Sequence, residues 1–268
     1  PIIDKPIIQH IVEEINFAGF EEIIFVTHSS KNSIQNHFDT SFELENSLEK
    51  KLKRPLLNEL KEINNFNTKI ISVRQGEALG LGHAILQSKN AVSGEPFAVI
   101  LPDRVMNKFE INLRKDNLAF MKKHFDKFQS NIILIEKIEK KFSNMYGMVK
   151  EKILKQDSCN ILLDILEKPS IENSPSNKAV LGRYIFKNNI FDSLEYVAAR
   201  NKKSKKEIEL TDAIKHYIKN SETIFTSLSK GECFDCGNKM GYLKAILYYA
   251  KNHKDTSKAF KKIISELS

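Results

Sequence analysis

The stretch PFAVILPD, residues 96–103, decides the fold class of this chain, because it places a short apolar strand directly before a carboxylate. A continuous apolar run between breakers is typical of a strand buried on both faces, as in a parallel sheet. Ligands of open α/β sheets bind beyond the carboxyl ends of the strands, where Asp103 would project. One carboxylate there suits Mg²⁺, which otherwise takes phosphate and water oxygens. The alternative is a loop Asp that caps the next helix.

Strands and helices alternate outward from this stretch. The first half is predicted to contain helices over 7–15, 81–91 and 117–128 and strands over 23–27, 70–73, 97–101 and 131–135. The second half is β-rich over 145–186, with strands at 148–149, 161–166 and 180–186, and then has helices over 210–218 and 240–250. This alternation predicts βαβ units, a mostly parallel sheet and one α/β domain.

Local signals bound several of these elements. Gly19 would end the first helix, and Ser29 or Ser30 would cap the helix after the first strand. The charged segment 43–65 is interpreted as a helical insertion over one sheet edge, with a partner surface. The helix over 240–250 would bury three apolar side chains, Leu243, Ile246 and Leu247.

Composition argues against several classes of protein. With 268 residues, 41% of them hydrophobic, the chain can bury a full core. No apolar run approaches the ~20 residues that cross a bilayer, and the N-terminus lacks a signal-peptide pattern. Three cysteines argue against a disulfide scaffold and fit a reducing cytoplasm. The C-x-x-C of Cys233 and Cys236 has no second pair, so a zinc site or redox motif is poorly supported.

The chain is basic, with a net charge of +8 from 42 basic and 34 acidic residues. This charge permits binding of nucleic acid or of acidic substrates. The lysines are scattered along the sequence and are not clustered with aromatic residues, which argues against a nucleic-acid-binding face.

The loop at 74–84, RQGEALGLGHA, joins a predicted strand to a helix. Glycines allow close backbone approach, and N–H groups at a helix N-terminus attract phosphate or polar base edges. Gln75 offers a donor and an acceptor, which suits the Watson–Crick edge of a pyrimidine. The alternative is an ordinary tight turn, with His83 as a packed helix residue.

Two further strand ends carry charged side chains. Glu167 and Lys168 precede Pro169, which stops strand pairing. A carboxylate accepts from sugar hydroxyls and an ammonium neutralises phosphate; the alternative is an exposed salt bridge. Asp235 lies between an extended segment and a helix start, so it is either a second metal carboxylate beside Asp103 or a helix cap.

Together these segments resemble the bacterial UTP–glucose-1-phosphate uridylyltransferases from residue 1 to about residue 250. The longest shared motif is VTHSSKNSIQNHFDTSFELE at 26–45. The others are DKPIIQ, RQG followed by GLGHAIL, VILPD, EKP, PSNKAVLGRY, ELTDAI and FDCGNKMGY. The resemblance implies a Rossmann-like nucleotidyltransferase fold that makes UDP-glucose and pyrophosphate from UTP and glucose 1-phosphate in the presence of Mg²⁺.

The resemblance also implies residue roles. Residues 1–135 would form mainly the nucleotide-binding half and residues 136–268 mainly the sugar-phosphate half with the C-terminal helices. The implied nucleotide-binding residues are Gln75, Gly76 and Gly80, and the implied Mg²⁺ ligands are Asp103 and Asp235. The implied sugar-binding residues are Tyr146, Gly147, Glu167, Lys168 and Gly182, with Lys168 and Asp103 as the catalytic pair. Attack of the sugar phosphate on the α-phosphorus of UTP would be in line, without a covalent enzyme intermediate.

Two departures from the family pattern stand out. Family members open with a strand and a glycine-rich loop bearing an Arg and a Lys, and that segment would precede Pro1. We therefore expect residues 1–268 to be an N-terminally truncated enzyme, inactive or nearly so alone and poorly folded, because a lost central strand exposes unpaired backbone. Appreciable UDP-glucose formation by residues 1–268 would refute this. Arg104 is also unexpected after the metal Asp, and only a local salt bridge accounts for it.

Two alternatives to this function remain, one with a different substrate and one without catalysis. A sibling transferase would use dTTP, CTP or another sugar phosphate, and a non-catalytic module would bind nucleotide or nucleic acid. The resemblance favours UTP, glucose 1-phosphate and UDP-glucose as partners. It implies a homodimer or homotetramer in the cytoplasm, with neither nucleic acid nor membrane as a partner.

Overall fold

The computed structural model describes residues 1–39, 47–51, 53–54, 68–155, 158–202, 206–220 and 222–267. The helical insertion predicted over 43–65 lies largely outside these residues. Within the described ranges, no helix is both long enough and apolar enough to span a lipid bilayer.

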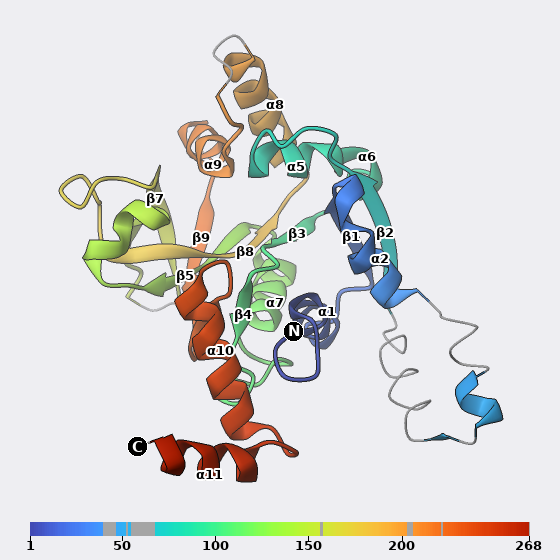
Figure 1. The fold of residues 1–268 in the computed structure, drawn as a ribbon. Coiled ribbons are helices and arrows are strands. Elements are labelled where there is room, and N and C mark those ends of the chain that lie inside the picture. Colours follow the sequence, from blue (N-terminus) through green and yellow to red (C-terminus); the bar gives the residue numbers. More distant parts are fainter. Residues whose placement is uncertain are drawn as a thin grey trace.

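A six-stranded sheet forms the centre of the molecule, in the order β3-β8-β5-β9-β7-β6 (Figure 1). Its strands are β3 (Phe97–Ile100), β5 (Asn131–Lys137), β6 (Gly147–Lys152), β7 (Cys159–Glu167), β8 (Lys178–Phe186) and β9 (Ile224–Leu228). The two-stranded sheets are β1 (Glu22–Thr27) with β2 (Lys69–Arg74), and β4 (Arg104–Met106) with β10 (Cys233–Asp235).

The α/β class and the mixed sheet with flanking helices are confirmed, but the strand pairing differs from the expectation. Of the pairs between named strands, β1–β2 and β5–β9 are parallel. The pairs made by β8 with β3 and β5, and by β7 with β6 and β9, are antiparallel. The reason is that β7 and β8, from the β-rich second half, are inserted against the direction of β3, β5 and β9.

The strand of the PFAVILPD stretch is therefore not held in a parallel pair. β3 pairs antiparallel with β8, and all four of its residues are only half-buried. It ends the order of the six-stranded sheet, so among the described strands β8 is its one sheet partner. The prediction of a strand at 97–101 is confirmed, and the prediction of a parallel strand buried on both faces is wrong.

Helices cover both faces of the sheet (Figure 1). Helices α5 (Leu81–Gln87), α8 (Ile190–Asn201) and α9 (Leu210–Lys219) pack on one face, and α1 (Ile7–Phe17) and α7 (Leu118–Phe128) pack on the other. The remaining helices are α2 (Asn32–Phe38), α6 (Lys89–Val92), α10 (Lys239–Asn252) and α11 (Ser257–Leu267), with 3-10 turns at Ser29–Lys31 and Lys140–Met145.

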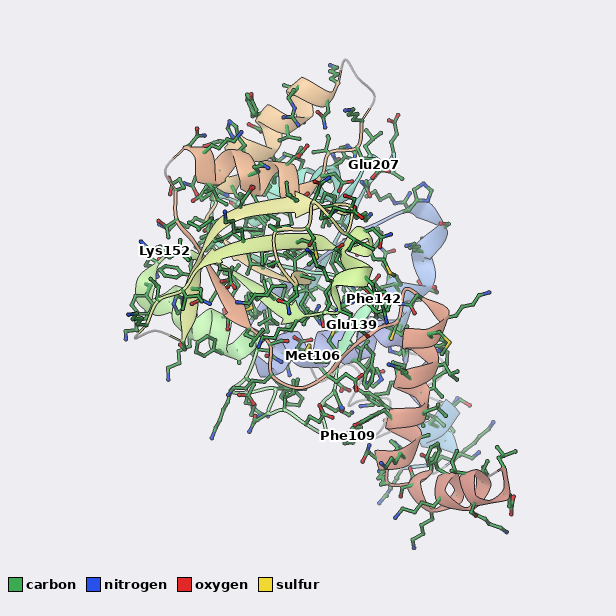
Figure 2. All side chains as sticks on the ribbon, turned by 90° about the vertical axis from the view of Figure 1, so that its left-hand side faces the viewer. Met106, Phe109, Glu139, Phe142, Lys152 and Glu207 are labelled. Atoms are coloured by element: carbon green, nitrogen blue, oxygen red, sulfur yellow. The ribbon has the colours of Figure 1, made fainter. Side chains whose placement is uncertain are left out.

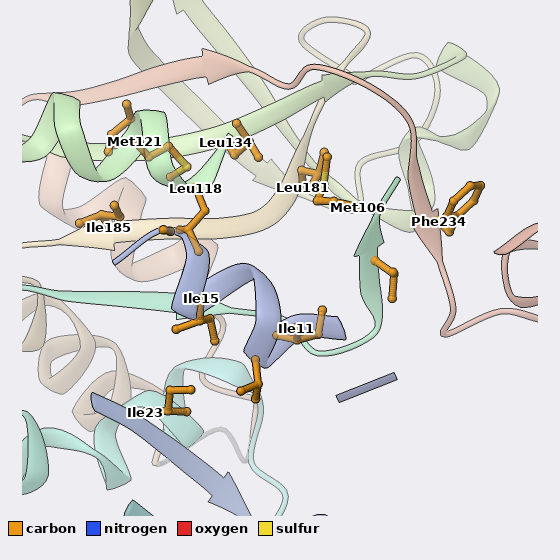
Figure 3. Close-up of a cluster of buried hydrophobic side chains, with 14 of the residues drawn as sticks. Ile11, Ile15, Ile23, Met106, Leu118, Met121, Leu134, Leu181, Ile185 and Phe234 are labelled. Carbon is orange, nitrogen blue, oxygen red and sulfur yellow. The ribbon is translucent and has the colours of Figure 1, made fainter. Parts of the chain in front are cut away.

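Two apolar cores result, one on each face of the sheet. Alternate residues of β5 divide between them: Ile132 and Leu134 join the core with α1 and α7, whereas Ile133 and Ile135 join the core with α8 and α9. This is the two-residue period of a strand that is buried on both faces. Figure 3 shows the first core, with Leu134 facing side chains of α1 and α7.

The helix boundaries confirm some local predictions and correct others. Gly19, with φ of 83°, follows the cap of α1 as predicted. The predicted caps Ser29 and Ser30 are wrong, because a 3-10 turn intervenes and α2 begins only at Asn32. The helix predicted over 81–91 is divided at Ser88 into α5 and α6.

The prediction of which face of α10 is buried is also wrong. Leu243 and Leu247 are 46% and 42% exposed, whereas Ala245 and Tyr249 are buried. Both pairs have the same i, i+4 spacing, so periodicity alone could not choose between the two stripes. The Tyr249 hydroxyl decides the orientation, since it donates to the carbonyl oxygen of Met106 at 3.2 Å.

Candidate active site

Asp103 and Asp235 are brought to one place by the pairing of β4 with β10. The antiparallel register sets Arg104 opposite Asp235, and the Cys236 N–H donates to the carbonyl oxygen of Asp103 at 2.8 Å. A Cβ atom added to Gly237 would lie 2.8 Å from Oδ2 of Asp103 and 3.2 Å from Oδ1 of Asp235. The two carboxylates therefore face the same small space, which stays open because residue 237 is a glycine.

This pair of carboxylates fits a divalent cation. Carboxylate oxygens are hard donors, and Mg²⁺ is usually held by one or two of them together with substrate phosphates and water. Among the described residues there is no group of three or more His, Cys, Asp or Glu side chains able to hold an ion. An ion between Asp103 and Asp235 would thus take its other ligands from substrate and solvent.

The orientation of the Asp235 carboxylate is set through its Oδ2 atom. The Tyr146 hydroxyl donates to this oxygen at 2.8 Å, and Nη1 of Arg104 lies 3.3 Å from it. Arg104 is buried, pairs with Glu136, and has its guanidinium 5.3 Å from the centre of the Tyr146 ring. With Oδ2 occupied, Oδ1 accepts from the Gly237 N–H at 3.1 Å and faces Asp103.

Burial also keeps the Tyr146 hydroxyl and the two neighbouring thiols protonated. Burial, followed by the hydrogen bond to Asp235, raises the pKa of the Tyr146 hydroxyl to about 12. Tyr146 therefore remains a donor at neutral pH. Burial likewise raises the pKa of the Cys233 thiol to about 12 and that of Cys236 to about 11, so neither is a ready nucleophile.

A second cluster lies where β6 and β7 pair. Gly147 is opposite Glu167, and a Cβ at Gly147 would lie 3.5 Å from Oε2 of Glu167. The Thr211 hydroxyl donates to the same Oε2 at 3.0 Å. Lys168 follows with φ of 42°, and its Nζ lies 3.6 Å from Oε1 of Glu167. A left-handed non-glycine residue costs about 1–3 kcal/mol, and such residues cluster at active sites as well as at helix ends.

Tyr146 connects the two clusters. Its carbonyl oxygen accepts from the Lys168 N–H at 3.1 Å, while its hydroxyl holds Asp235. The predicted residues Asp103, Asp235, Tyr146, Gly147, Glu167 and Lys168 therefore belong to one connected arrangement.

Gly182 contacts Leu101, which lies two residues before Asp103. It has φ of 82°, and a Cβ there would lie 2.9 Å from the Leu101 side chain. The Leu101 N–H donates to the Gly182 carbonyl oxygen at 2.9 Å. Its contacts hold the end of the PFAVILPD stretch, so Gly182 supports the position of Asp103.

The glycine loop after β2 is held by the segment before α9. The Ile208 N–H donates to Leu79 O at 2.8 Å, and the Gly82 N–H donates to Ile208 O at 2.7 Å. Gly80 has φ of 98°, and a Cβ there would lie 2.9 Å from Ile208 O, so only glycine fits. By contrast, a Cβ at Gly76 would meet nothing within 4 Å.

Comparison with known proteins shows the family to which this chain belongs. The nucleotidyl transferase family matches residues 1–252. The UTP–glucose-1-phosphate uridylyltransferase of Haemophilus ducreyi is 46% identical over 100% of this chain and 90% of that protein. The enzyme of the same name from Escherichia coli strain K12 is 43% identical over 99% of this chain and 87% of that protein. The chain is a member of the UTP–glucose-1-phosphate uridylyltransferase family.

Solved structures of this uridylyltransferase family agree with the fold. The UDP-glucose pyrophosphorylase of Acinetobacter baumannii has a TM-score of 0.89 at 38% identity, covering 100% of this chain and 90% of that chain. A UDP-glucose pyrophosphorylase in complex with UDP-glucose has a TM-score of 0.79 at 34% identity, covering 94% of this chain and 89% of that chain.

Sequence analysis missed the residues that support the site in this family member. Arg183 is fully buried, and its guanidinium donates to the carbonyl oxygens of Leu101 at 3.2 Å and Arg104 at 2.7 Å. Thr211, which was also missed, holds Glu167. Arg104 was expected to form a local salt bridge, and it pairs with both Glu136 and Asp235. Arg183 and Thr211 lie inside the motifs PSNKAVLGRY and ELTDAI, but a motif does not state which atom a side chain reaches.

Proposed function

We propose that the full-length protein joins UTP and glucose 1-phosphate into UDP-glucose and releases pyrophosphate, with residues 1–268 supplying the site described above. The observation that carries this proposal is the full-length relationship, at 43–46% identity, to enzymes named for that reaction. A related enzyme from Acinetobacter baumannii is known in a UTP-bound form. The convergence of Asp103 and Asp235 supports the same chemistry, because a phosphate chain needs charge neutralisation at the reacting phosphorus.

Asp103 and Asp235 are proposed as the ligands of Mg²⁺, with Asp103 also acting in catalysis. The cation, when bound, offsets negative charge on the phosphate chain and on the departing pyrophosphate. The protein contributes orientation: Arg104 and Tyr146 hold one oxygen of Asp235, and Gly237 leaves the space beside the other open. This agrees with a donor set completed by substrate oxygens.

The sugar phosphate is proposed to bind at the β6–β7 pair. Glu167 accepts from a glucose hydroxyl, and Lys168 neutralises the phosphate and acts in catalysis. Tyr146 and Gly147 shape the pocket directly, and Gly182 shapes it through its contact with Leu101. A phosphate oxygen of glucose 1-phosphate then attacks the α-phosphorus of UTP in line, the new P–O bond forms, and pyrophosphate leaves with the electrons of the broken bond. Positioning and charge neutralisation supply the rate, without an enzyme-bound intermediate.

The uracil base is proposed to bind at the loop after β2, with Gln75 and Gly76 at its polar edge and Gly80 close to the base or ribose. Open space beside Gly76 leaves its backbone accessible. In this assignment residues 1–135 serve mainly the nucleotide and residues 136–268 mainly the sugar phosphate, within one domain that shares the central sheet.

A substrate panel tests the proposal. The full-length protein is assayed for pyrophosphate release with glucose 1-phosphate and UTP, dTTP or CTP, with and without Mg²⁺. We expect UTP to give the highest kcat/KM and Mg²⁺ to be required. A higher kcat/KM for dTTP or CTP would assign the chain to a sibling reaction, and no turnover with any of them would contradict the proposal.

A homodimer or homotetramer in the cytoplasm is proposed as the working form. Helices α10 and α11 extend away from the body beside Phe109 (Figure 2). Their exposed apolar side chains are Met240, Leu243, Leu247, Ile263, Ile264 and Leu267. Contiguous exposed apolar surface is typical of association sites. Light scattering after size-exclusion chromatography would contradict this if it gave a monomer at micromolar concentration.

A further inference from the structure

The side-chain nitrogen Nε2 of Gln75 makes two polar contacts. Its Nε2 lies 3.3 Å from the carbonyl oxygen of Gly80 and 3.0 Å from Nδ1 of His83. A carbonyl oxygen can only accept, so the amide atom facing Gly80 must be the nitrogen and not the oxygen. The Gly80 carbonyl thus identifies the amide atom on this side as the nitrogen, and Nδ1 of His83 is the second partner of that nitrogen.

This orientation is compatible with only one neutral tautomer of His83. The same amide nitrogen meets Nδ1 of the ring, so Nδ1 must accept and the neutral ring carries its proton on Nε2. Nε2 of the Gln87 amide lies 3.1 Å from that ring Nε2, one helical turn further along α5. Two donors cannot face each other, so we assign the Gln87 amide turned over, with its oxygen toward the ring proton. Gly80, Gln75, His83 and Gln87 form a chain in which each donor faces an acceptor.

The consequence concerns the atom of Gln75 that remains for a ligand. Both hydrogens of Nε2 are used by Gly80 and His83, and Oε1 has no hydrogen-bond partner among the described residues. Oε1 only accepts. Uracil carries a donor at N3, whereas cytosine carries an acceptor at N3. A Gln75 that meets the base at N3 would therefore accept uracil and repel cytosine.

The loop cannot relieve this constraint by turning the Gly80 carbonyl. Leu79 and Gly82 on either side of it are tied to Ile208, and Gly80 itself packs against the Ile208 carbonyl oxygen. The Gly80 contact alone is long, at 3.3 Å, and therefore weak. The shorter contact to Nδ1 of His83, at 3.0 Å, is the second hold on the same amide nitrogen, and without it the amide can turn over.

We propose that His83 is a positioning residue that sets the preference for uridine over cytidine nucleotides by locking the Gln75 amide with its oxygen toward the base. This rests on the proposed function, in which Gln75 reads the uracil edge. Thymine has the same N3 donor as uracil, so the lock gives no discrimination against dTTP.

The test compares kcat/KM for UTP with that for CTP in the full-length protein and in three variants. His83→Leu removes the acceptor, and His83→Asn places an amide oxygen near the position of Nδ1. Gln87→Met removes the oxygen that fixes the ring proton. We expect the UTP/CTP ratio to fall about tenfold in His83→Leu, about threefold in Gln87→Met and less than about twofold in His83→Asn. The change should appear in KM for the nucleotide and in its calorimetric Kd, with kcat for UTP little altered.

The outcomes separate this inference from the proposed function. A wild-type protein without preference for UTP over CTP would contradict the proposed reading of uracil by Gln75. A wild-type preference that persists unchanged in His83→Leu would overturn the role of His83 and leave the proposed function standing. Equal losses in His83→Leu and His83→Asn would also overturn it, because rescue by an acceptor is what distinguishes positioning from packing. If His83→Leu does not fold, an unchanged ratio in Gln87→Met overturns the inference.

Discussion

Arg183 holds the backbone of Arg104 from a fully buried position, with Nη2 2.7 Å from the Arg104 carbonyl oxygen. Its Nη1 reaches the carbonyl oxygen of Leu101, so one guanidinium braces both sides of the turn that carries Asp103. The charge is balanced by Glu14 of α1, whose two carboxylate oxygens accept at 2.7 and 3.0 Å. The position of Asp103, the proposed metal ligand, therefore depends on a buried ion pair between α1 and β8.

We predict that Arg183→Met destabilises the protein by about 3–5 kcal/mol, because Glu14 is left buried without a partner. Urea unfolding measures the change. The double variant Arg183→Met/Glu14→Leu should recover part of the loss. The control is Arg200→Met, which breaks an exposed pair with Asp212 and should cost at most about 1 kcal/mol. A cost for Arg183→Met no greater than that of Arg200→Met would show that the pair does not brace the turn.

Gly237→Ala should weaken divalent metal binding about tenfold without unfolding the protein, since the new Cβ occupies the space between the two carboxylates. Electron paramagnetic resonance of Mn²⁺ in the presence of UTP measures the affinity, and thermal unfolding checks the fold. Ser265→Ala, at an exposed position on α11, is the control, and it should leave Mn²⁺ affinity unchanged. Equal affinity in the wild type and Gly237→Ala would exclude this space as the metal site.

Thr211→Val should raise KM for glucose 1-phosphate about fivefold to tenfold and leave KM for UTP unchanged. The substitution keeps the shape of the side chain but removes the hydroxyl that orients Glu167. Steady-state kinetics with each substrate varied in turn measures both constants. Thr256→Val, which also loses a hydroxyl donor but lies between α10 and α11, should alter neither. A parallel rise in both KM values would indicate a general loss of structure.

His10 should make the protein less stable in mild acid. Burial, followed by the charge of Lys108, lowers the pKa of His10 from 6.5 to about 4, whereas the unfolded chain keeps the ordinary value. The unfolded state then binds the proton first, so the His10 contribution to the free energy of unfolding is constant above pH 6.5 and falls as the pH drops from 6.5 to 4. The His10 contribution to that fall is about 3 kcal/mol.

Urea unfolding at pH 7 and pH 4.5 tests this. His10→Leu should lose less stability between the two pH values than the wild type, by about 2–3 kcal/mol. His28→Leu, at an exposed position, should retain the wild-type difference. Identical pH dependence in His10→Leu and the wild type would show that another group is responsible.

The local sequence was enough to predict most elements of this fold and the ends of the strands that carry the site. Apolar spacing predicted the ends of α1, α7 and α9 to within two residues, and it predicted Asp103 and Asp235 at the ends of extended segments. These features depend on hydrophobic period and on breakers, which act over a few residues. The resemblance to a family then assigned roles to the same positions, and those roles stay predictions.

Tertiary structure alone decided which elements and side chains meet. The insertion of β8 between β3 and β5, the contact of Arg183 with Glu14 across 169 residues, and the burial of Tyr249 in place of Leu247 have no local signal. The same holds for the orientation of the Gln75 amide, which depends on a carbonyl oxygen fixed by Ile208. Each of these features depends on the packing of surfaces that come from distant parts of the chain. The local sequence does not decide them, because apolar stripes with the same spacing fit a helix equally well and a strand can pair with more than one partner.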